Sequence, residues 1–324
     1  MGVGAASDKE YPRKLSDIVI RDPFVLVYDG KYYMYGTGAS GRGYGCFVSP
    51  DLINWSEPVT VFERPEGFDG IKDFWAPECH FYKGSFYLFA TYYSSESGKR
   101  GTAIFSSESP LGPFKLISDG HVTPKERDCI DGTLYVDGDG TPWIVYVNEW
   151  TSNSDGVGEM AAARLSDDLT RIVGEPKVLF RADEPIWAAN GVTDGPFVYT
   201  TYTGKLIMLW SNFDRNGYVL GMAYSDKITG KWRQSAKPLY RKDKKNIYDG
   251  GHGMIFTDLG GKLMISIHQP NDDSEPPRPA FYHVVDAGEA LLLDNASTGF
   301  EKFIFDLKLF AAKFISFFTA FKIK

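Results

Sequence analysis

Asp22-Pro23, followed by FVLVYDGKYYMYGT at residues 24–37, begins a pattern of residues that returns four more times along the chain. A polar residue leads an apolar strand, a turn that contains glycine follows, and a second strand rich in aromatic residues completes the unit. Short runs of β-branched and aromatic residues between turn residues are typical of strands. Each unit therefore predicts an antiparallel pair of strands.

The four further copies keep the same order of elements. Their strands read CHFYKGSFYLFATYY (79–93), TLYVDGDGTPWIVYV (133–147), FVYTTYTGKLIMLWS (197–211) and MIFTDLGGKLMISIHQ (254–269). The residues that lead them are Glu78, Asp131, Asp194 and His252. Counted from Asp22, successive leading residues are 56, 53, 63 and 58 positions apart. This spacing indicates one structural unit of nearly constant size.

A polar turn rich in serine follows a later strand in four of the five units. It lies at residues 49–51, 106–110, 166–168 and 225–227. About four strands per unit, repeated five times, predict an all-β fold, a five-bladed β-propeller over residues 16–295. A β-sandwich would also contain many strands, but it would not return the same unit five times.

Composition narrows the class of protein. The chain has 324 residues, of which 43% are hydrophobic, and this is enough for one large domain with a sizeable core. A net charge of −7 without a long basic run argues against a nucleic-acid partner. Cys46, Cys79 and Cys129 lack the spacing of metal ligands and are odd in number, so neither a zinc site nor a disulfide framework is expected.

The two ends of the chain fall outside the repeats. Residues 1–15 lack the apolar core of a signal peptide, and we expect either a lead-in or a strand that closes the last blade. Residues 296–324 are rich in Phe and Lys, and the alternatives are an amphipathic helix, docked on the domain or a membrane surface, and a foreign end. Lys308 and Lys313 interrupt the apolar run, so no membrane span is expected. The sequence leaves the compartment undecided.

Acidic residues lead four of the five units. In a propeller the innermost strand of each blade follows the central channel, so Asp22, Glu78, Asp131, Asp194 and His252 are predicted to surround one opening. Each carboxylate raises the pKa of its neighbours, and folding alone gives no reason for such crowding. Acid–base catalysis does, because one carboxyl must be protonated and another ionised at the same pH. A turn role explains any single Asp-Pro or Asp-Gly dipeptide, but not four at matching places.

Five short motifs together resemble glycoside hydrolase family 43. They are Arg21-Asp22-Pro23, Trp75-Ala76-Pro77-Glu78, Ile130-Asp131-Gly132, Thr193-Asp194-Gly195-Pro196 and Gly251-His252-Gly253. The resemblance covers about residues 15–290 and implies an inverting hydrolase that releases α-L-arabinofuranosyl or β-D-xylosyl residues from plant-type oligo- or polysaccharides. It implies no required cofactor, although a cation such as calcium in the channel is allowed. It also favours a secreted or periplasmic location.

The resemblance implies a role for each leading residue. Asp22 matches the general base, and Asp131 matches the carboxylate that orients the acid and keeps its pKa high. Asp194 stands where the family usually has Glu as general acid, and because Asp is one methylene shorter, Glu78 stays open as the alternative acid. His252 resembles an axial histidine that holds a water or a cation, and a hydrogen-bonded histidine without metal is the other interpretation.

Further residues are candidates for substrate binding. Phe74, Trp75 and Trp187 precede axial motifs and are predicted to cover the pocket as sugar platforms, with core packing as the alternative for each. Arg278, in PPRPAFYHV, either reaches the pocket from the last blade or lies in a surface turn.

Three classes of function follow. The first is an arabinofuranosidase or xylosidase that removes terminal residues or side chains, or an endo-arabinanase with an open groove. The second is a carbohydrate-binding propeller that has lost catalysis, which the Asp at position 194 keeps open and the retained Asp22 and Asp131 argue against. The third is a scaffold for protein partners, which would predict no acidic ring.

Overall fold

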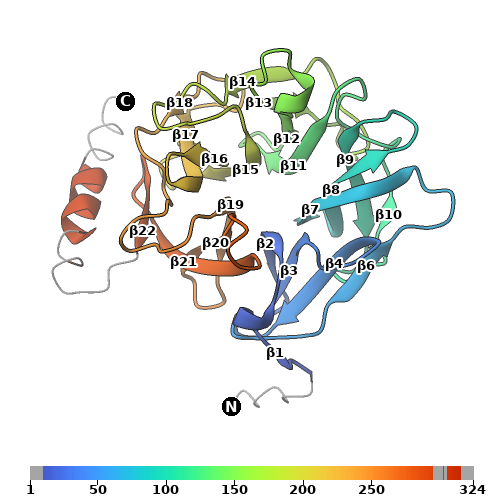
Figure 1. The fold of residues 1–324 in the computed structure, drawn as a ribbon, viewed down its shortest axis with the longest axis horizontal. Coiled ribbons are helices and arrows are strands. Elements are labelled where there is room, and N and C mark those ends of the chain that lie inside the picture. The colour runs from blue at the N-terminus through green and yellow to red at the C-terminus, as the bar shows by residue number, and fades with distance from the viewer. Residues whose placement is uncertain (1–9, 295–301, 303–304, 315–324) are drawn as a thin grey trace.

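The computed structural model describes residues 10–294, 302 and 305–314. Five four-stranded antiparallel sheets surround a central axis, and the first strand of each sheet lies innermost (Figure 1). This arrangement confirms the five-bladed β-propeller.

Each blade is built from consecutive strands. Blade 1 contains β2 (Arg21–Tyr28), β3 (Lys31–Thr37), β4 (Gly43–Ser49) and β6 (Val59–Glu63). Blade 2 contains β7 (Gly70–Tyr82), β8 (Ser85–Ser94), β9 (Arg100–Ser107) and β10 (Lys115–Leu116). Blade 3 contains β11 (Cys129–Val136), β12 (Pro142–Asn148), β13 (Glu159–Arg164) and β14 (Lys177–Arg181). Blade 4 contains β15 (Asp194–Thr200), β16 (Leu206–Asp214), β17 (Gly217–Ser225) and β18 (Arg233–Gln234). Blade 5 contains β19 (Gly251–Thr257), β20 (Leu263–Gln269), β21 (Arg278–Asp286) and β22 (Leu291–Asp294).

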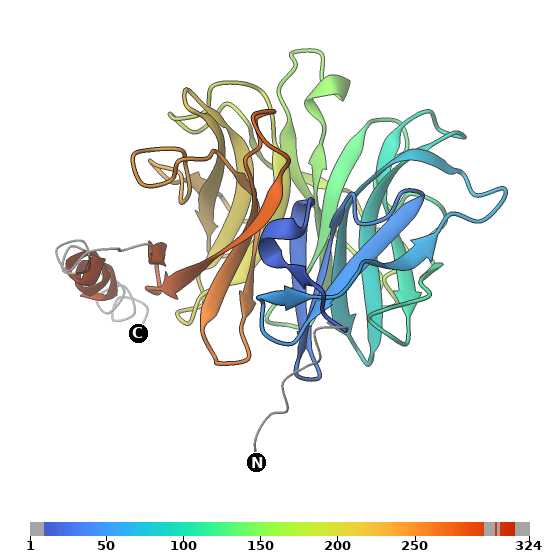
Figure 2. The same ribbon diagram turned by 60° about the horizontal axis from the view of Figure 1, so that its bottom comes forward.

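The described part of the N-terminal segment, from residue 10 on, adds no strand to the last blade. Strand β1 (Arg13–Lys14) pairs with β5 (Asn54–Trp55) beside blade 1, so residues 10–15 form a lead-in. The short helix η1 (Leu15–Asp17) then lies against blade 5 (Figure 2), and a second such helix, η2 (Trp150–Ser152), follows β12. The N–H of Ile20 donates to the carbonyl of Pro277 at 3.0 Å, which joins the first and last blades directly.

Apolar side chains fill the spaces between neighbouring blades. Along β16, Met208 and Trp210 pack toward blade 3, whereas Ile207 and Leu209 pack toward blade 5. Successive side chains of a strand point to opposite faces, and here both faces are covered by protein. This explains why the second strand of each unit is a continuous apolar run.

The innermost strands share a β-bulge at the end of the channel where they begin. Each bulge holds one residue in the left-handed region, namely Asp22 (φ 56°), Ala76 (41°), Asp131 (55°), Gly195 (50°) and His252 (52°). These positions lie 54, 55, 64 and 57 residues apart. They define the structural repeat, because each has the left-handed conformation at the bulge of its innermost strand.

This repeat corrects the alignment based on acidic residues. In blade 2 the position equivalent to Asp22 is Ala76, so Glu78 lies two residues further along its strand. In blade 4 the equivalent position is Gly195, so Asp194 lies one residue before it. An alignment of the units by residue type therefore misplaced both carboxylates. Equivalent positions in the bulges are defined by backbone conformation and not by residue type.

At four of the five bulges, a side chain on the second strand of the preceding blade accepts the N–H of the left-handed residue. Thr37 Oγ1 accepts from Ala76 (2.7 Å), and Thr91 Oγ1 accepts from Asp131 (3.0 Å). Ser211 Oγ accepts from His252 (2.7 Å), and His268 Nδ1 accepts from Asp22 (3.2 Å).

Val147 occupies the corresponding position in blade 3 and has no acceptor to offer. There the N–H of Gly195 donates instead to Oδ2 of Asp131 at 3.0 Å. These five hydrogen bonds satisfy backbone groups that the bulges remove from the sheets, and they tie each blade to the next.

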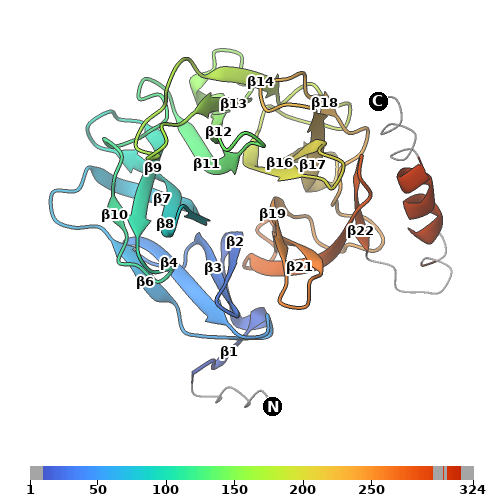
Figure 3. The same cartoon turned by 180° about the vertical axis from the view of Figure 1, so that it is seen from behind.

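The C-terminal segment was expected to be helical in part. Residues 305–314 form a helix that lies outside the ring of blades, beside β22 (Figure 3). Phe305 and Lys308 line a cavity together with Leu291 and Leu293 of blade 5. Most other residues of the 296–324 segment lie outside the described residues. Within the described residues, no helix combines the length and apolar character that crossing a membrane requires.

The hydrogen bonds between blades predict a stability effect. Thr91→Val keeps the side-chain shape but leaves the N–H of Asp131 without its acceptor, so we expect a loss of about 1–3 kcal/mol in the free energy of unfolding. Thr193→Val is the matched control, because both threonines are fully buried and Thr193 Oγ1 has no partner among the described residues. Denaturant unfolding measures both variants, and equal losses would contradict the role given to Thr91.

Candidate active site

All five blades contribute to one pocket at the end of the channel where the bulges lie. Its volume is about 360 Å³. Its walls contain polar, acidic and aromatic side chains, namely Arg21, Asp22, Thr37, Trp75, Ile130, Asp131, Glu149, Trp150, Asp194, Tyr218, His252 and His268. Three of the four predicted carboxylates and the predicted histidine therefore meet in one place.

The bulge explains which side chains enter this pocket. Asp22, Asp131 and His252 enter from the left-handed positions themselves. In blades 2 and 4 that position holds Ala76 or Gly195, and the residue before it, Trp75 or Asp194, lines the pocket instead. Asp194 thus approaches from a different backbone position than the other two carboxylates.

Asp22 is surrounded by groups that stabilise its charge. Thr37 Oγ1 donates to its Oδ2 at 2.6 Å, and the Nδ1 atoms of His252 and His268 lie 3.1 and 3.4 Å from its Oδ1. Burial by itself raises the pKa of Asp22, but the two imidazoles and the hydroxyl outweigh it and hold the pKa well below its usual range. Asp22 is therefore ionised at neutral pH.

Asp194 has the opposite protonation state to Asp22. Burial, followed by the charge of Asp131, raises the pKa of Asp194 to about 8. The Tyr218 hydroxyl donates to Oδ2 of Asp194 at 2.9 Å and lowers this pKa in part, as the imidazole of His252 also does. Asp194 therefore carries a proton at neutral pH.

Asp131 contacts the backbone beside Asp194 and also lies near His252, which faces Asp22. Its Oδ2 accepts the N–H of Gly195, the residue directly after Asp194, and lies 3.8 Å from Nδ1 of His252. Burial, then the charge of Asp22, raise the pKa of Asp131 well above its usual range. The side chain thus holds the backbone next to Asp194 while it adjusts the electrostatics of the pocket.

An ionised and a protonated carboxyl at the same opening can act as base and acid in one reaction. The environment of each group, and not its chemical type, separates the two pKa values. This division of roles is what hydrolysis of a glycosidic bond requires.

Glu78 does not line the pocket. It is 4% exposed and lies deeper along β7, with Oε2 3.3 Å from Nε2 of His80. Burial raises the pKa of Glu78 to about 8, so this group is also protonated, but away from the opening. The structure therefore places Glu78 outside the pocket that the other three carboxylates line, which corrects its predicted place in the ring.

The three aromatic residues that were expected to cover the pocket lie in three different places. Trp75 lines the pocket, whereas Phe74 lines a neighbouring cavity and packs edge-on against Tyr44. Trp187 packs against Trp210 with ring centroids 5.4 Å apart and lines no part of the pocket. For Trp187 the structure shows core packing, because its indole fills the space over Gly221 in blade 4.

Arg278 does not reach the pocket either. Its guanidinium donates to the carbonyl of Ser16, so it helps to join the last blade to the start of the first. The pocket instead receives Arg21, which donates to Oδ1 of Asn271.

Several pocket residues were missed by sequence reasoning. Trp150 and Glu149 follow β12, and Tyr218 is the second residue of β17. Thr37 and His268 lie opposite the bulge on the second strands of their blades, paired with Arg21 and Gly251. A signal for these two existed, because in four of the five units a polar residue interrupts an apolar strand 15 or 16 positions after the left-handed residue. Finding it required the correct repeat.

One network supports the aromatic wall. The guanidinium of Arg100 lies 4.9 Å from the ring centroid of Trp75. Arg100 Nη1 donates to both carboxylate oxygens of Glu149, at 3.0 and 2.9 Å, and Nε donates to Asp73 at 3.0 Å. Arg100 thus connects blades 2 and 3 and holds Trp75 against the pocket.

His252 was also considered as a place for a cation. Its Nδ1 faces Asp22 at 3.1 Å, and its ring lies over Gly195, where a β-carbon would approach it to within 2.6 Å. Among residues 10–294 and the described part of the tail, no three His, Cys, Asp or Glu side chains are grouped so that they could hold a metal ion. A cation that His252 holds through a water molecule therefore stays a prediction.

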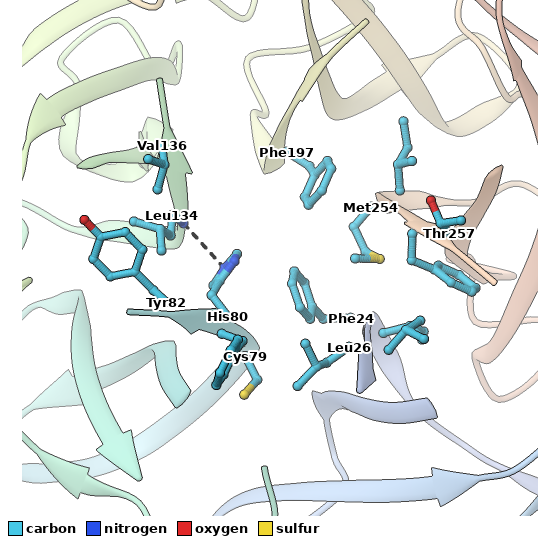
Figure 4. Close-up of a pocket in the computed structure, with 15 residues that line it drawn as sticks. Phe24, Leu26, Cys79, His80, Tyr82, Leu134, Val136, Phe197, Met254 and Thr257 are labelled. Atoms are coloured by element: carbon cyan, nitrogen blue, oxygen red, sulfur yellow. Dashed lines mark hydrogen bonds between the residues drawn. The ribbon is translucent and has the colours of Figure 1, made fainter. Parts of the chain in front are cut away.

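A larger hollow of about 580 Å³ lies at the far ends of the innermost strands (Figure 4). Phe24, Leu26, Phe197 and Met254 make its walls mostly apolar. His80 also lines it, but burial lowers the pKa of His80 to about 3, so the ring is neutral. This hollow contains no carboxylate pair, and the smaller pocket remains the candidate active site.

Comparison with known proteins agrees with this geometry. The model of "Glycosyl hydrolases family 43" matches residues 15–283. The chain is 24% identical over 255 residues to extracellular endo-α-(1→5)-L-arabinanase 1 of Bacillus subtilis (strain 168), which covers 73% of this chain and 72% of the relative.

Solved structures give the same result. An endo-arabinase from Bacteroides thetaiotaomicron VPI-5482 is 38% identical with a TM-score of 0.77, covering 85% of this chain and 97% of that chain. A thermostable family-43 glycoside hydrolase is 27% identical with a TM-score of 0.78, covering 86% and 93%. An endo-1,4-β-xylanase from B. thetaiotaomicron VPI-5482 is 27% identical with a TM-score of 0.74, covering 89% and 96%.

The chain therefore belongs to glycosyl hydrolases family 43, as its motifs predicted, and is a glycosidase.

The raised pKa of Asp194 predicts how stability depends on pH. An unfolded Asp loses its proton near pH 4, whereas the folded protein retains the proton of Asp194 up to about pH 8, so folding becomes less favourable as pH rises between these values. Asp194→Asn avoids this cost. We expect it to exceed the wild type by roughly 5 kcal/mol in unfolding free energy at pH 8, with little difference at pH 4.

Denaturant unfolding at several pH values measures this difference. Asp167→Asn, on an exposed turn of blade 3, controls for the loss of one carboxylate. A stability difference between Asp194→Asn and wild type that does not grow from pH 4 to pH 8 would contradict the protonated state.

Proposed function

We propose that this family 43 glycosidase hydrolyses α-L-arabinofuranosyl linkages of arabinan with inversion of configuration. The observation that carries the proposal is that Asp22 and Asp194 line one pocket while their pKa values are displaced in opposite directions. Asp22 is the general base, Asp194 is the general acid, and Asp131 positions the acid.

In the proposed reaction, ionised Asp22 accepts a proton from a water molecule as the water oxygen attacks the anomeric carbon. Asp194 donates its proton to the glycosidic oxygen as the bond from that oxygen to the anomeric carbon breaks. Water arrives on the face opposite to the leaving group, so the configuration inverts. Electrostatic interactions with His252 and His268 keep Asp22 ready to accept the proton.

Asp194 is favoured over Glu78 as the acid because it lines the pocket. Both carboxyls are protonated at neutral pH, so the pKa values do not distinguish them. Their access to the substrate distinguishes them, because a general acid must come within hydrogen-bond distance of the leaving oxygen. The Tyr218 hydroxyl holds one oxygen of Asp194, which leaves the other oxygen to carry the proton.

The substrate is proposed from the relatives together with the pocket. The solved relative with 38% identity is an endo-arabinase, and the curated relative is an endo-α-(1→5)-L-arabinanase. A β-D-xylosyl substrate is supported by the name of a relative at 27% identity. A pocket with Trp75 and Trp150 offers aromatic faces to either sugar, so the substrate assay decides between them.

The catalytic roles predict the behaviour of three variants. Asp22→Asn and Asp194→Asn should each lower kcat/KM on linear arabinan by about 100-fold or more, because each removes one partner in proton transfer. Glu78→Gln should lose far less, since Glu78 lies outside the pocket. Reducing-sugar release from arabinan and from xylan measures all three, and NMR of the first anomer formed tests inversion.

Other outcomes would favour other functions. Hydrolysis of xylan alone would replace arabinan with a xylosyl substrate. Binding of arabinan without hydrolysis of any substrate would favour the carbohydrate-binding propeller. A larger loss in Glu78→Gln than in Asp194→Asn would transfer the acid role to Glu78.

Tyr218 predicts a shift in the pH profile. Activity should fall as pH rises through about 8, where Asp194 loses its proton. The bond from Tyr218 stabilises the ionised form, so Tyr218→Phe should raise the pKa of Asp194 and move this limb to higher pH. The pH dependence of kcat/KM measures the shift, and a move to lower pH would contradict the interaction.

A further inference from the structure

A second cavity continues from the active-site pocket across the junction of blades 1 and 2. Its volume is about 420 Å³, and Thr37 and Trp75 line both cavities. The loop between β3 and β4, the segment after β6 and the start of β7 supply its other walls. A chain of sugars bound in the pocket could therefore extend into it without passing over bulk surface.

Three cations line this second cavity. They are Arg42, Arg64 and Lys72. The guanidinium of Arg64 donates to the carbonyls of Gly70 and Ile71, at 3.3 and 3.1 Å, and the ammonium of Lys72 lies 4.5 Å from the ring centroid of Tyr93. These partners orient Arg64 and Lys72 without neutralising them.

Carboxylates compensate little of this charge. Within the described ranges, no carboxylate lies within ion-pair distance of Arg42, Arg64 or Lys72. Asp73 is the acidic residue among the cavity walls, and Arg100 pairs with it at 3.0 Å. A chain with a net charge of −7 thus keeps a local positive field beside its acidic pocket.

The walls also suit a sugar ring. Phe74 and Trp75 line the cavity together, and aromatic faces cover the apolar side of a sugar. A small inorganic anion would use the cations but not this surface. The combination of aromatic surface and uncompensated cations fits a sugar that carries a carboxylate.

We propose that this second cavity is a subsite for a uronic acid residue of the polysaccharide, at a position beyond the sugar held in the active-site pocket. The proposal rests on the proposed function, because it takes the ligand to be part of the same polysaccharide chain. Arg42 and Lys72 attract and bind the carboxylate, Arg64 adds to the field, and Trp75 separates the two sugar positions.

Binding tests the subsite independently of hydrolysis. Asp22→Asn protein, which keeps the polymer intact, is titrated calorimetrically with an arabinan-bearing polysaccharide that contains galacturonic acid, and with the same polysaccharide after its carboxyl groups are reduced to alcohols. The native polymer should bind about tenfold more tightly at low ionic strength, with the preference shrinking in high salt. Adding Arg42→Gln and Lys72→Gln together should abolish the preference.

A matched control removes the same charge elsewhere. Lys231→Gln with Arg233→Gln changes two exposed cations on the outer side of blade 4 and should keep the preference. Equal binding of the native and reduced polymers, no binding of either, or a preference that survives Arg42→Gln with Lys72→Gln would overturn the subsite. Absence of hydrolysis by the wild type would instead reject the proposed function and leave the binding comparison valid.

Discussion

A hydrogen bond from the N–H of one left-handed residue to a side chain of the preceding blade holds each pair of neighbouring blades in register. It occurs at each of the five bulges, through Thr37, Thr91, Ser211, His268 and the carboxylate of Asp131. A left-handed residue other than glycine costs about 1 kcal/mol, and a buried N–H without a partner costs more. The hydrogen bonds offset both costs and align the blades, so that side chains from remote segments meet at one opening.

Asp131, the carboxylate among these acceptors, has a role both in the fold and in the active site. Where blade 3 presents Val147, Asp131 supplies the missing acceptor and is thereby held beside Asp194. The same carboxylate completes the architecture and contributes to the pKa of its neighbour. Backbone strain retained at an opening of this kind is typical of functional sites, because surrounding contacts must fix the conformation.

Charge is distributed unevenly around the opening. Imidazoles and a hydroxyl surround Asp22, whereas Asp194 has a carboxylate and the Tyr218 hydroxyl near it. Two chemically identical side chains therefore take opposite protonation states within one pocket. A short distance away, Arg42 and Lys72 lack carboxylate partners in the described part of the chain, and the field changes sign along the path that an extended sugar chain would follow.

Residue patterns alone were sufficient to predict the number of blades, the strand pairs and the meeting of Asp22, Asp131, Asp194 and His252 at one opening, because repetition and strand patterning can be read along the chain. Which residues are equivalent became clear from the folded structure. Glu78 was matched to Asp22 by residue type, yet Ala76 holds the equivalent left-handed position. Glu78 lies two residues further along the strand, and its side chain is therefore outside the pocket. Tyr218, His268 and the cations of the second cavity were also beyond the sequence, since contacts between blades depend on bulge register, which residue types alone do not encode.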